Sequence, residues 1–154
     1  MPIWPARTFD SRRTGDPLLP SNGIAITWLD QYRTPITWVG GVVANVTVVG
    51  PTSGGWLAAF SADEPTTPFT SNITFASGET VANQVMSGAS QRAVGTVPAG
   101  SVAVFNPYGS TPLILDVFGL YTSDLAPWPA VLATEARALS ASVGPLQSAT
   151  TPLR

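Results

Sequence analysis

The chain has 154 residues, among them 15 prolines and 14 glycines, and only 10% of its positions are charged, with a formal net charge of −2. This length suits one domain with a short extension, and the many Pro and Gly residues suit short strands joined by turns. The sequence contains no Cys, His or Lys. These absences exclude thiol and Ser-His nucleophiles, lysine Schiff bases, zinc sites built on His or Cys, and P-loop chemistry.

Targeting and partner signals are equally sparse. Residues 1–7 lack the basic start and apolar core of a signal peptide, so we expect synthesis in the cytoplasm. Gly, Pro or Asn interrupts every apolar run within about ten residues, which predicts no membrane insertion. The longest basic run is Arg12-Arg13, so we expect no nucleic-acid partner.

Residues 1–22 are predicted to form an irregular N-terminal arm. The prolines of this segment oppose a helix or a central strand. The motif from Arg7 to Arg12 combines Arg and Asp side chains. Two interpretations of this motif stay open: an ion pair that pins the arm to the domain, and a solvated arm. We assign Trp4 to an assembly interface.

Residues 23–122 are predicted to form an all-β domain, an antiparallel β-sandwich of jelly-roll or Greek-key type. The signals are short β-branched or aromatic runs bounded by turn residues. The predicted strands cover 23–29, 36–39, 42–49, 56–60, 71–75, 81–86, 92–97, 101–105 and 113–121, with a break at Gly40-Gly41. Two of the runs, 42–50 and 80–86, are alike in having one Asn within β-branched residues, which suggests an internal duplication.

Polar side chains inside these strands are predicted to be structural. In the run 42–49 the even positions are apolar and share one face, whereas Asn45 and Thr47 lie on the other. Buried amides mostly bond backbone, so Asn45, Asn72 and Asn83 are assigned structural roles. Asp116 interrupts an apolar strand and needs a partner. We expect a pairing of Asp116 with an arginine, and the candidates are Arg7, Arg12 and Arg92.

Residues 123–154 are predicted to form a linker, a short helix over 130–143 and a C-terminal tail. The helix is indicated by Ala and Leu content, by Pro129 at its start and by Gly144-Pro145 at its end. Apolar side chains of this segment need a surface to cover, so we expect a homo-oligomer. Together with Trp4, the predicted assembly contacts are Leu125, Trp128, Val131, Leu132 and Leu139.

Several motifs between Arg7 and Tyr121 together resemble a repeat domain of actinobacterial secreted and cell-surface proteins, which also occurs in particle proteins of actinobacterial phages. The resemblance implies an all-β module without catalytic residues, used in surface display or adhesion. The segment after Thr122 lies outside it. The residues that carry it are 7–12, 43–48, 55–57, 71–75, 78–85, 106–111 and 115–121.

A single display module without a signal peptide favours a virion component. We therefore expect a non-enzymatic structural accessory protein of a bacteriophage particle, either a capsid decoration protein or a minor tail protein. Its expected partners are other virion proteins and copies of itself. The alternative is an extracellular or cell-surface adhesion module that binds host glycan. In that case Tyr32, Trp38, Trp56 and Tyr108 are the candidates for stacking on sugars, and packing within the core or an interface is the competing role for each.

An enzyme is the third hypothesis, and we expect no cofactor and no metal. A carboxylate glycosidase needs two acids about 5 to 10 Å apart, and no spacing in the sequence singles out such a pair. No loop matches the spaced oxygen ligands of a calcium site. The available acids are Asp10, Asp16, Asp30, Asp63, Glu64, Glu79 and Asp116.

Overall fold

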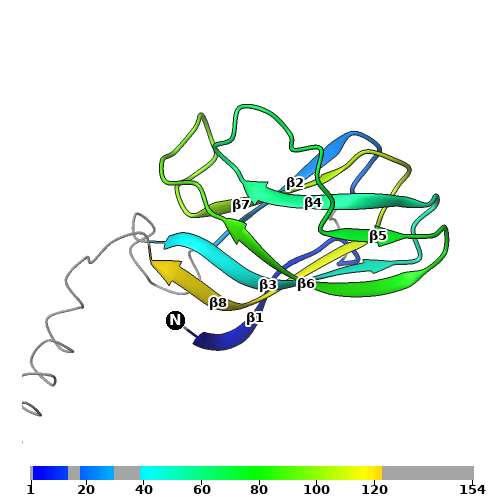
Figure 1. Cartoon of the computed structure of the whole chain (residues 1–154), viewed down its shortest axis with the longest axis horizontal. Helices are drawn as coiled ribbons and strands as arrows, with labels where there is room; N and C mark the ends of the chain where they lie inside the picture. The colour runs from blue at the N-terminus through cyan, green and yellow to red at the C-terminus, as the bar shows by residue number, and fades with distance from the viewer. Residues whose placement is uncertain (1, 14–17, 30–38, 123–154) are drawn as a thin grey trace, which may run out of the picture. The chain divides into compact units, whose positions relative to one another are not determined.

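A computed structural model describes residues 2–13, 18–29 and 39–122. These residues form β-strands and no helix, and none of their elements is a helix of the length and apolar character needed to cross a membrane. The strands are β1 Pro2–Asp10, β2 Gly23–Trp28, β3 Val39–Val49, β4 Gly55–Ser61, β5 Ile73–Phe75, β6 Thr80–Gly88, β7 Ser101–Asn106 and β8 Leu113–Thr122 (Figure 1).

The strands form two four-stranded antiparallel sheets that pack against each other, with orders β1-β8-β3-β6 and β2-β7-β4-β5. The all-β class and the antiparallel sandwich are therefore confirmed. The predicted helix over 130–143 and most of the predicted strand over 36–39 lie outside the described residues.

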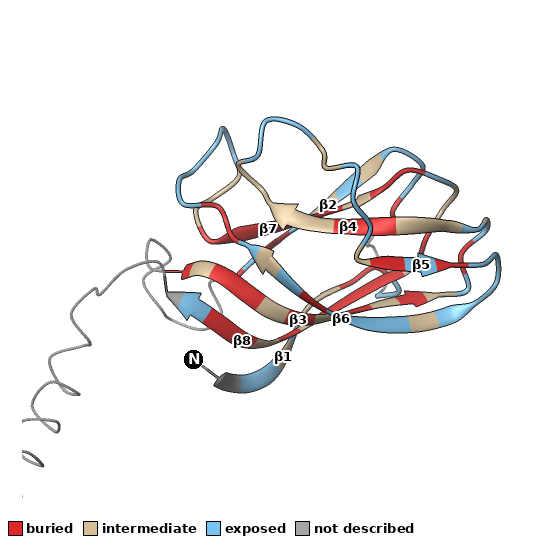
Figure 2. Cartoon of the chain, in the orientation of Figure 1, coloured by how far each residue is buried: buried red, intermediate tan, exposed pale blue. Residues whose placement is uncertain are grey.

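The core lies between the sheets and follows the period-two pattern of the sequence. On β3, Val42, Ala44, Val46 and Val48 are all at most 1% exposed, whereas the alternate positions are only half-buried. They pack with aliphatic side chains of the facing sheet in one cluster. Figure 2 shows buried residues on strands of both sheets. Removing apolar surface from water on these faces is the main stabilising contribution.

The segment before residue 23 differs from the irregular arm that the sequence predicts. Pro2–Asp10 forms strand β1, which pairs with β8 at the edge of its sheet. An edge strand tolerates Pro because only one of its sides needs backbone donors. Register shifts between Pro2 and Ala6 and between Arg7 and Phe9 absorb the irregularity. The sandwich therefore begins well before the predicted boundary at residue 23.

Two further predictions need correction. Strand β3 continues through Gly40 and Gly41, with a register shift between Val39 and Gly41 instead of a break. Residues 92–97 form a tight turn and not a strand. The backbones of Val94 and Val97 bond to each other, and Gly95 between them has a φ of 58°. A two-residue loop whose first residue has a positive φ forms a hairpin turn. The segment 92–97 therefore reverses direction and does not form a strand.

Candidate docking surface

Strand β2 directs large apolar side chains away from the core. Ala25 packs against the core cluster, and the Thr27 hydroxyl donates to the carbonyl of Thr8 in the facing sheet over 3.2 Å. The alternate positions must therefore point outward. Their side chains are half-exposed: Ile24 is 47%, Ile26 42% and Trp28 45% exposed.

The neighbouring strands β7 and β4 extend this outer face. The register places Ala103 between Ile26 and Phe60, and Phe105 between Ile24 and Ala58. Ala58 and Ala103 are at most 2% exposed and yet lie outside the core cluster. They are therefore the buried floor of a second apolar layer on the outer side of the sheet.

Trp56 continues the layer on β4. Its ring packs edge-to-face against Phe105, with 5.9 Å between ring centroids and 70° between planes. Along the outward positions of β2, β7 and β4 the sequence places no charged side chain. We call this surface the apolar face, and its large side chains are Ile24, Ile26, Trp28, Trp56, Phe60 and Phe105.

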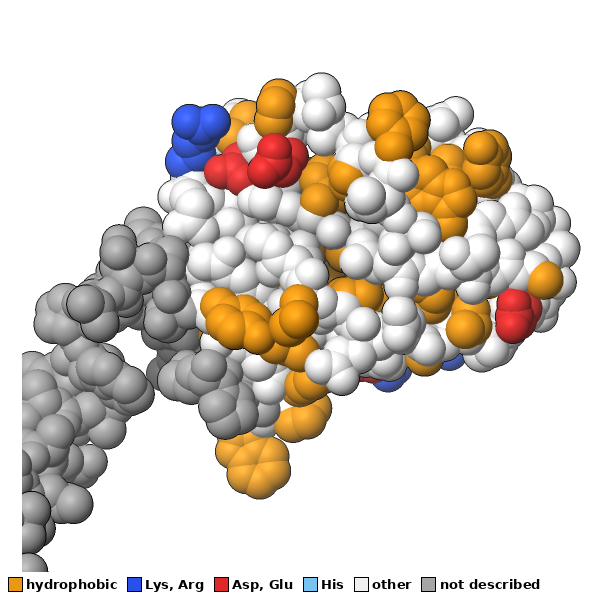
Figure 3. Space-filling model, viewed as in Figure 1, with side chains coloured by type: hydrophobic (Ala, Val, Ile, Leu, Met, Phe, Trp, Pro, Cys, Tyr) orange, Lys and Arg blue, Asp and Glu red, His pale blue; other side chains and the backbone are white. Residues whose placement is uncertain are grey.

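Polar groups border the apolar face at the end where β4 finishes. Asp63 accepts hydrogen bonds from the Ser61 hydroxyl and from the Gln91 backbone N–H (3.1 Å). The hydrogen bond from Ser61 is the main reason that the pKa of Asp63 lies below its ordinary value. Figure 3 shows acidic and basic side chains at the upper left, where the loops after β4 and β6 lie, beside hydrophobic ones. An apolar centre with a polar rim is the usual anatomy of a protein interface.

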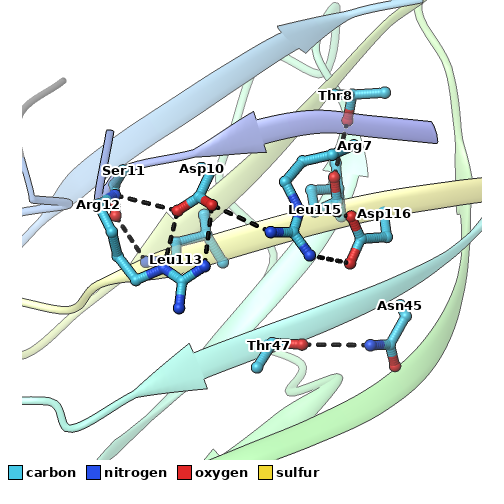
Figure 4. A network of polar contacts seen from close by, with 10 residues as sticks. All are labelled: Arg7, Thr8, Asp10, Ser11, Arg12, Asn45, Thr47, Leu113, Leu115 and Asp116. Carbon is cyan, nitrogen blue, oxygen red and sulfur yellow. Dashed lines mark hydrogen bonds and ion pairs between the residues drawn. The ribbon is translucent and has the colours of Figure 1, made fainter. Parts of the chain in front are cut away.

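The outer face of the other sheet is polar by comparison. The register lines up Arg7, Asp116, Asn45 and Gln84 across the four strands. Arg7 binds Asp116 through two hydrogen bonds, from Nε (2.8 Å) and from Nη2 (3.1 Å) (Figure 4). Asn45 donates to the Thr47 hydroxyl over 3.1 Å. Of the three arginines considered as partners of Asp116, Arg7 is the one that binds it. Asn45 bonds a side chain and not the backbone.

Asp10 lies at the centre of a second group of ionic contacts on β1. Arg12 donates to it from Nε (2.9 Å), from Nη2 (2.9 Å) and from its backbone N–H (3.1 Å), and Arg7 adds a bond of 3.2 Å. The carboxylate is only 6% exposed. The pKa of Asp10 lies well below its ordinary range. The largest cause is the hydrogen bonding from the Arg12 side chain, and the Arg12 backbone N–H and the Arg12 charge lower the pKa further.

Replacing Asp10 by Asn is expected to flatten the acid dependence of stability. A carboxyl with a pKa lowered by folding stabilises the native state above its unfolded pKa of about 4, and this contribution is lost as pH falls toward the folded pKa. Thermal melts should therefore show a lower midpoint for the variant at neutral pH and a gap to wild type that narrows between about pH 5 and pH 2. A gap that stays constant across this range would contradict a role for the Asp10 charge.

The remaining polar predictions fall on the edge between the two sheets. The Asn72 side chain accepts the Ala59 backbone N–H over 2.7 Å, and the Asn83 side chain donates to the Asn72 carbonyl over 2.6 Å. Both amides satisfy backbone groups, as expected for structural residues. A groove of about 280 Å³ lies here, lined by residues 71–74 and 81–83.

Sequence reasoning missed the structural role of a fully buried amide, Asn106. This fully buried side chain donates to the carbonyls of Leu19 (3.0 Å), Pro20 (3.1 Å) and Gly109 (3.0 Å). It thereby ties the segment before β2 to the turn after β7. In the sequence Asn106 reads as the first residue of an Asn-Pro-Tyr-Gly turn, and this local signal hides its long-range bonds.

Comparisons with protein-family models, with curated proteins and with solved structures find no match. The structure is therefore the basis for judging the predicted sites. Among the described residues, no three of the His, Cys, Asp and Glu side chains come together as metal ligands. Of the acids, Asp10 and Asp116 bind arginines, Glu79 accepts the Ala76 N–H over 2.7 Å, and Asp16 and Asp30 lie outside the described residues.

Of the four aromatic glycan candidates, only Trp56 and Tyr108 lie among the described residues. Trp56 belongs to the apolar face, and Tyr108 is a 55% exposed side chain whose ring lies beside Gly55. Neither residue lines the groove between β5 and β6. Tyr32 and Trp38 lie outside the described residues.

The predicted assembly contacts are described at one position only. Trp4, on edge strand β1, is 92% exposed. Its side chain is therefore available to a partner. The other members of the set, Leu125, Trp128, Val131, Leu132 and Leu139, lie outside the described residues.

Proposed function

We propose that the chain is a non-enzymatic structural accessory protein of a bacteriophage particle, a capsid decoration or minor tail protein. The apolar face of β2, β7 and β4 docks it on another protein of the particle. The observation that carries this proposal is the half-exposure of Ile24, Ile26 and Trp28 above a floor of buried alanines. Contiguous apolar surface rimmed by polar groups marks interaction sites in soluble proteins.

The chemistry of the apolar face favours a protein as its occupant. Sugar recognition needs polar groups placed beside aromatic rings, whereas the outward positions of β2, β7 and β4 carry a single hydroxyl, that of Ser101. Ser101 is fully buried, and its hydroxyl already donates to Pro98 over 2.8 Å. Tryptophan is enriched among the residues that contribute most to protein interfaces, and Trp28 and Trp56 both lie on this face.

The particle setting is supported by the motifs that resemble display modules of actinobacterial proteins and of their phages. In the fold these motifs occupy the end of β1, strands β3, β4, β5, β6 and β8, and the turn after β7. Within the same proposal, the exposed Trp4 and the apolar residues after 122 provide contacts to sister copies. The protein is made in the host cytoplasm and ends in the virion.

Mass spectrometry of purified particles tests this function. Particles are banded in a density gradient after lysis, and peptides of this chain are quantified against those of the other structural proteins. We expect copy numbers comparable with those of a structural component, and at least tenfold enrichment over abundant host proteins. Particles without the chain would disprove the proposal.

The adhesion module on a cell surface is the second candidate, and the exposed ring of Tyr108 is the observation that favours it. Aromatic rings on surface loops stack on sugars. The lysate used for the particle preparation also distinguishes the virion protein from the adhesion module. A chain that is absent from particles and sediments with host cell walls is an adhesion module.

A further inference from the structure

Strand β6 is an unprotected edge of the β1-β8-β3-β6 sheet. It pairs with β3 from Thr80 to Gly88 without a register shift. The opposite edge strand, β1, carries two prolines, two register shifts and Arg7, which are devices that prevent a further strand from pairing. β6 has no Pro and no charged residue. It is therefore the edge of this sheet that is open to another strand.

The direction of the free backbone groups follows from the two ends of the β3-β6 ladder. Gly50 N–H donates to the Glu79 carbonyl (3.0 Å), and Ala89 N–H donates to the Gly40 carbonyl (3.1 Å). Hydrogen-bonded pairs alternate along an antiparallel ladder, so the odd-numbered residues of β6 bond β3. The N–H and C=O groups that point to the free edge belong to Thr80, Ala82, Gln84, Met86 and Gly88.

These free groups are accessible. Among the described residues, the only hydrogen bond to one of these five residues' free backbone groups joins the Ser87 hydroxyl to the Gly88 carbonyl over 3.0 Å. The Asn83 side chain also bonds the Asn72 carbonyl, just before β5 of the facing sheet, and it uses no free backbone group of β6. Most of β6 is exposed or half-buried, and Figure 2 shows this along the strand. A row of unpaired donors and acceptors on a straight strand is a template for strand addition.

We propose that β6 pairs antiparallel with β6 of a second copy, about a two-fold axis at Gln84. Full overlap of the strand with itself requires Gln84 to lie opposite Gln84 of the second copy, Ala82 opposite Met86, and Thr80 opposite Gly88. All of these are residues whose backbone groups point to the free edge. The two sheets then join into one continuous sheet.

Self-pairing accounts for the side chains better than a foreign strand does. A two-fold axis places like residues opposite each other, so a charge near its centre would be repelled, and β6 carries none. A Gln amide both donates and accepts, so two Gln84 side chains can bond each other. The nearest charged residue, Glu79, would lie opposite Ala89. Because β1 is blocked, the pairing closes as a dimer and does not propagate.

The paired edge and the apolar face are on different sheets. A dimer formed through β6 therefore leaves both copies of the apolar face free. The inference does not depend on the proposed particle function, and it also applies to an adhesion module. For either function, two copies present two docking faces, and binding to a repeated surface gains from this bivalency.

Cysteine cross-linking of the full chain tests the pairing directly. The chain has no Cys, so Gln84→Cys introduces a single thiol. Residues in a hydrogen-bonded antiparallel pair have Cα atoms about 5.5 Å apart, which a disulfide spans. Under mild oxidation we expect more than half of the Gln84→Cys chains to run as a covalent dimer on non-reducing gels.

The matched control is Thr47→Cys, on the same outer face but on β3, inside the sheet, where a second copy does not reach. It should stay monomeric on the same gels. Cross-linking of Gln84→Cys no greater than that of Thr47→Cys would overturn the pairing. This readout is independent of contacts made elsewhere in the chain.

A charge exchange at the axis gives a second test. Gln84→Lys and Gln84→Glu each place like charges opposite each other, so each variant alone should weaken the dimer at least tenfold in light scattering. An equimolar mixture should restore it, because opposite charges then meet. Unchanged dimerisation of either single variant, or no recovery in the mixture, would overturn the two-fold arrangement at Gln84.

Discussion

Particles that lack the chain are expected to bind the Ile26→Asp variant at least 100-fold more weakly than the wild-type protein. Ile26 is the middle outward side chain of β2, and a partner on the apolar face would cover its exposed 42%. The variant loses apolar burial worth about 1 kcal/mol. It also buries an unpaired carboxylate at a cost of several kcal/mol. A total of at least about 3 kcal/mol corresponds to a loss of at least 100-fold in affinity, and titration with purified protein measures it.

The matched control for this experiment is Thr47→Asp, an outward position on β3 of the other sheet. It introduces the same charge and should bind within about twofold of wild type, since surface changes away from an interface have small effects. Thermal melts of both variants verify that they are folded. Equal binding of Ile26→Asp and Thr47→Asp would rule out the apolar face as the docking surface.

Replacing Asn106 by Ala is expected to destabilise the fold by about 3 kcal/mol, since each lost hydrogen bond contributes about 1 kcal/mol. The three carbonyls that Asn106 binds belong to Leu19, Pro20 and Gly109. The first two keep another donor, Thr111 N–H and Gly23 N–H respectively. The cost therefore comes from the lost bonds and from the space that the amide leaves. Urea unfolding measures it.

Asn45→Ala is the control for Asn106→Ala. Asn45 is half-buried and makes a single side-chain bond to Thr47. The Asn45→Ala variant should therefore lower the free energy of unfolding by no more than about 0.5 kcal/mol. Equal losses of stability in the two variants would show that the buried position of Asn106 has no special role. The comparison separates the amide that joins distant segments from one with a local partner.

Several features could be predicted because they depend on local patterns. Alternation along 42–49 placed Val46 and its neighbours on the core face, and β3 has that arrangement. The isolated carboxylate of Asp116 predicted an arginine partner, and Arg7 is the one that the fold supplies. Turn residues marked most strand ends correctly. The exceptions were β1, where prolines suggested an irregular arm, the Gly40-Gly41 pair, through which β3 continues, and the turn over 92–97.

Two of these exceptions have separate physical reasons. Pro2 and Pro5 exclude a central strand but not an edge strand, and only the sheet order shows that β1 lies at an edge. Val94 and Val97 are β-branched residues of the kind that favour strands. They bridge to each other across only two residues, so the segment closes into a turn and does not extend as a strand.

The sequence by itself determined that this protein is an all-β sandwich without Cys, His or Lys chemistry, because strand periodicity and composition are local properties. Only the tertiary structure decided which apolar side chains and which strand edge are exposed. Ile24, Ile26 and Trp28 look like core residues, and their strand turns them outward because Ala25 and Thr27 fill the narrow space against the facing sheet. Likewise, β6 is an open edge because of pairings between strands far apart in the chain. Such pairings depend on how complete sheets pack, and no local pattern encodes them.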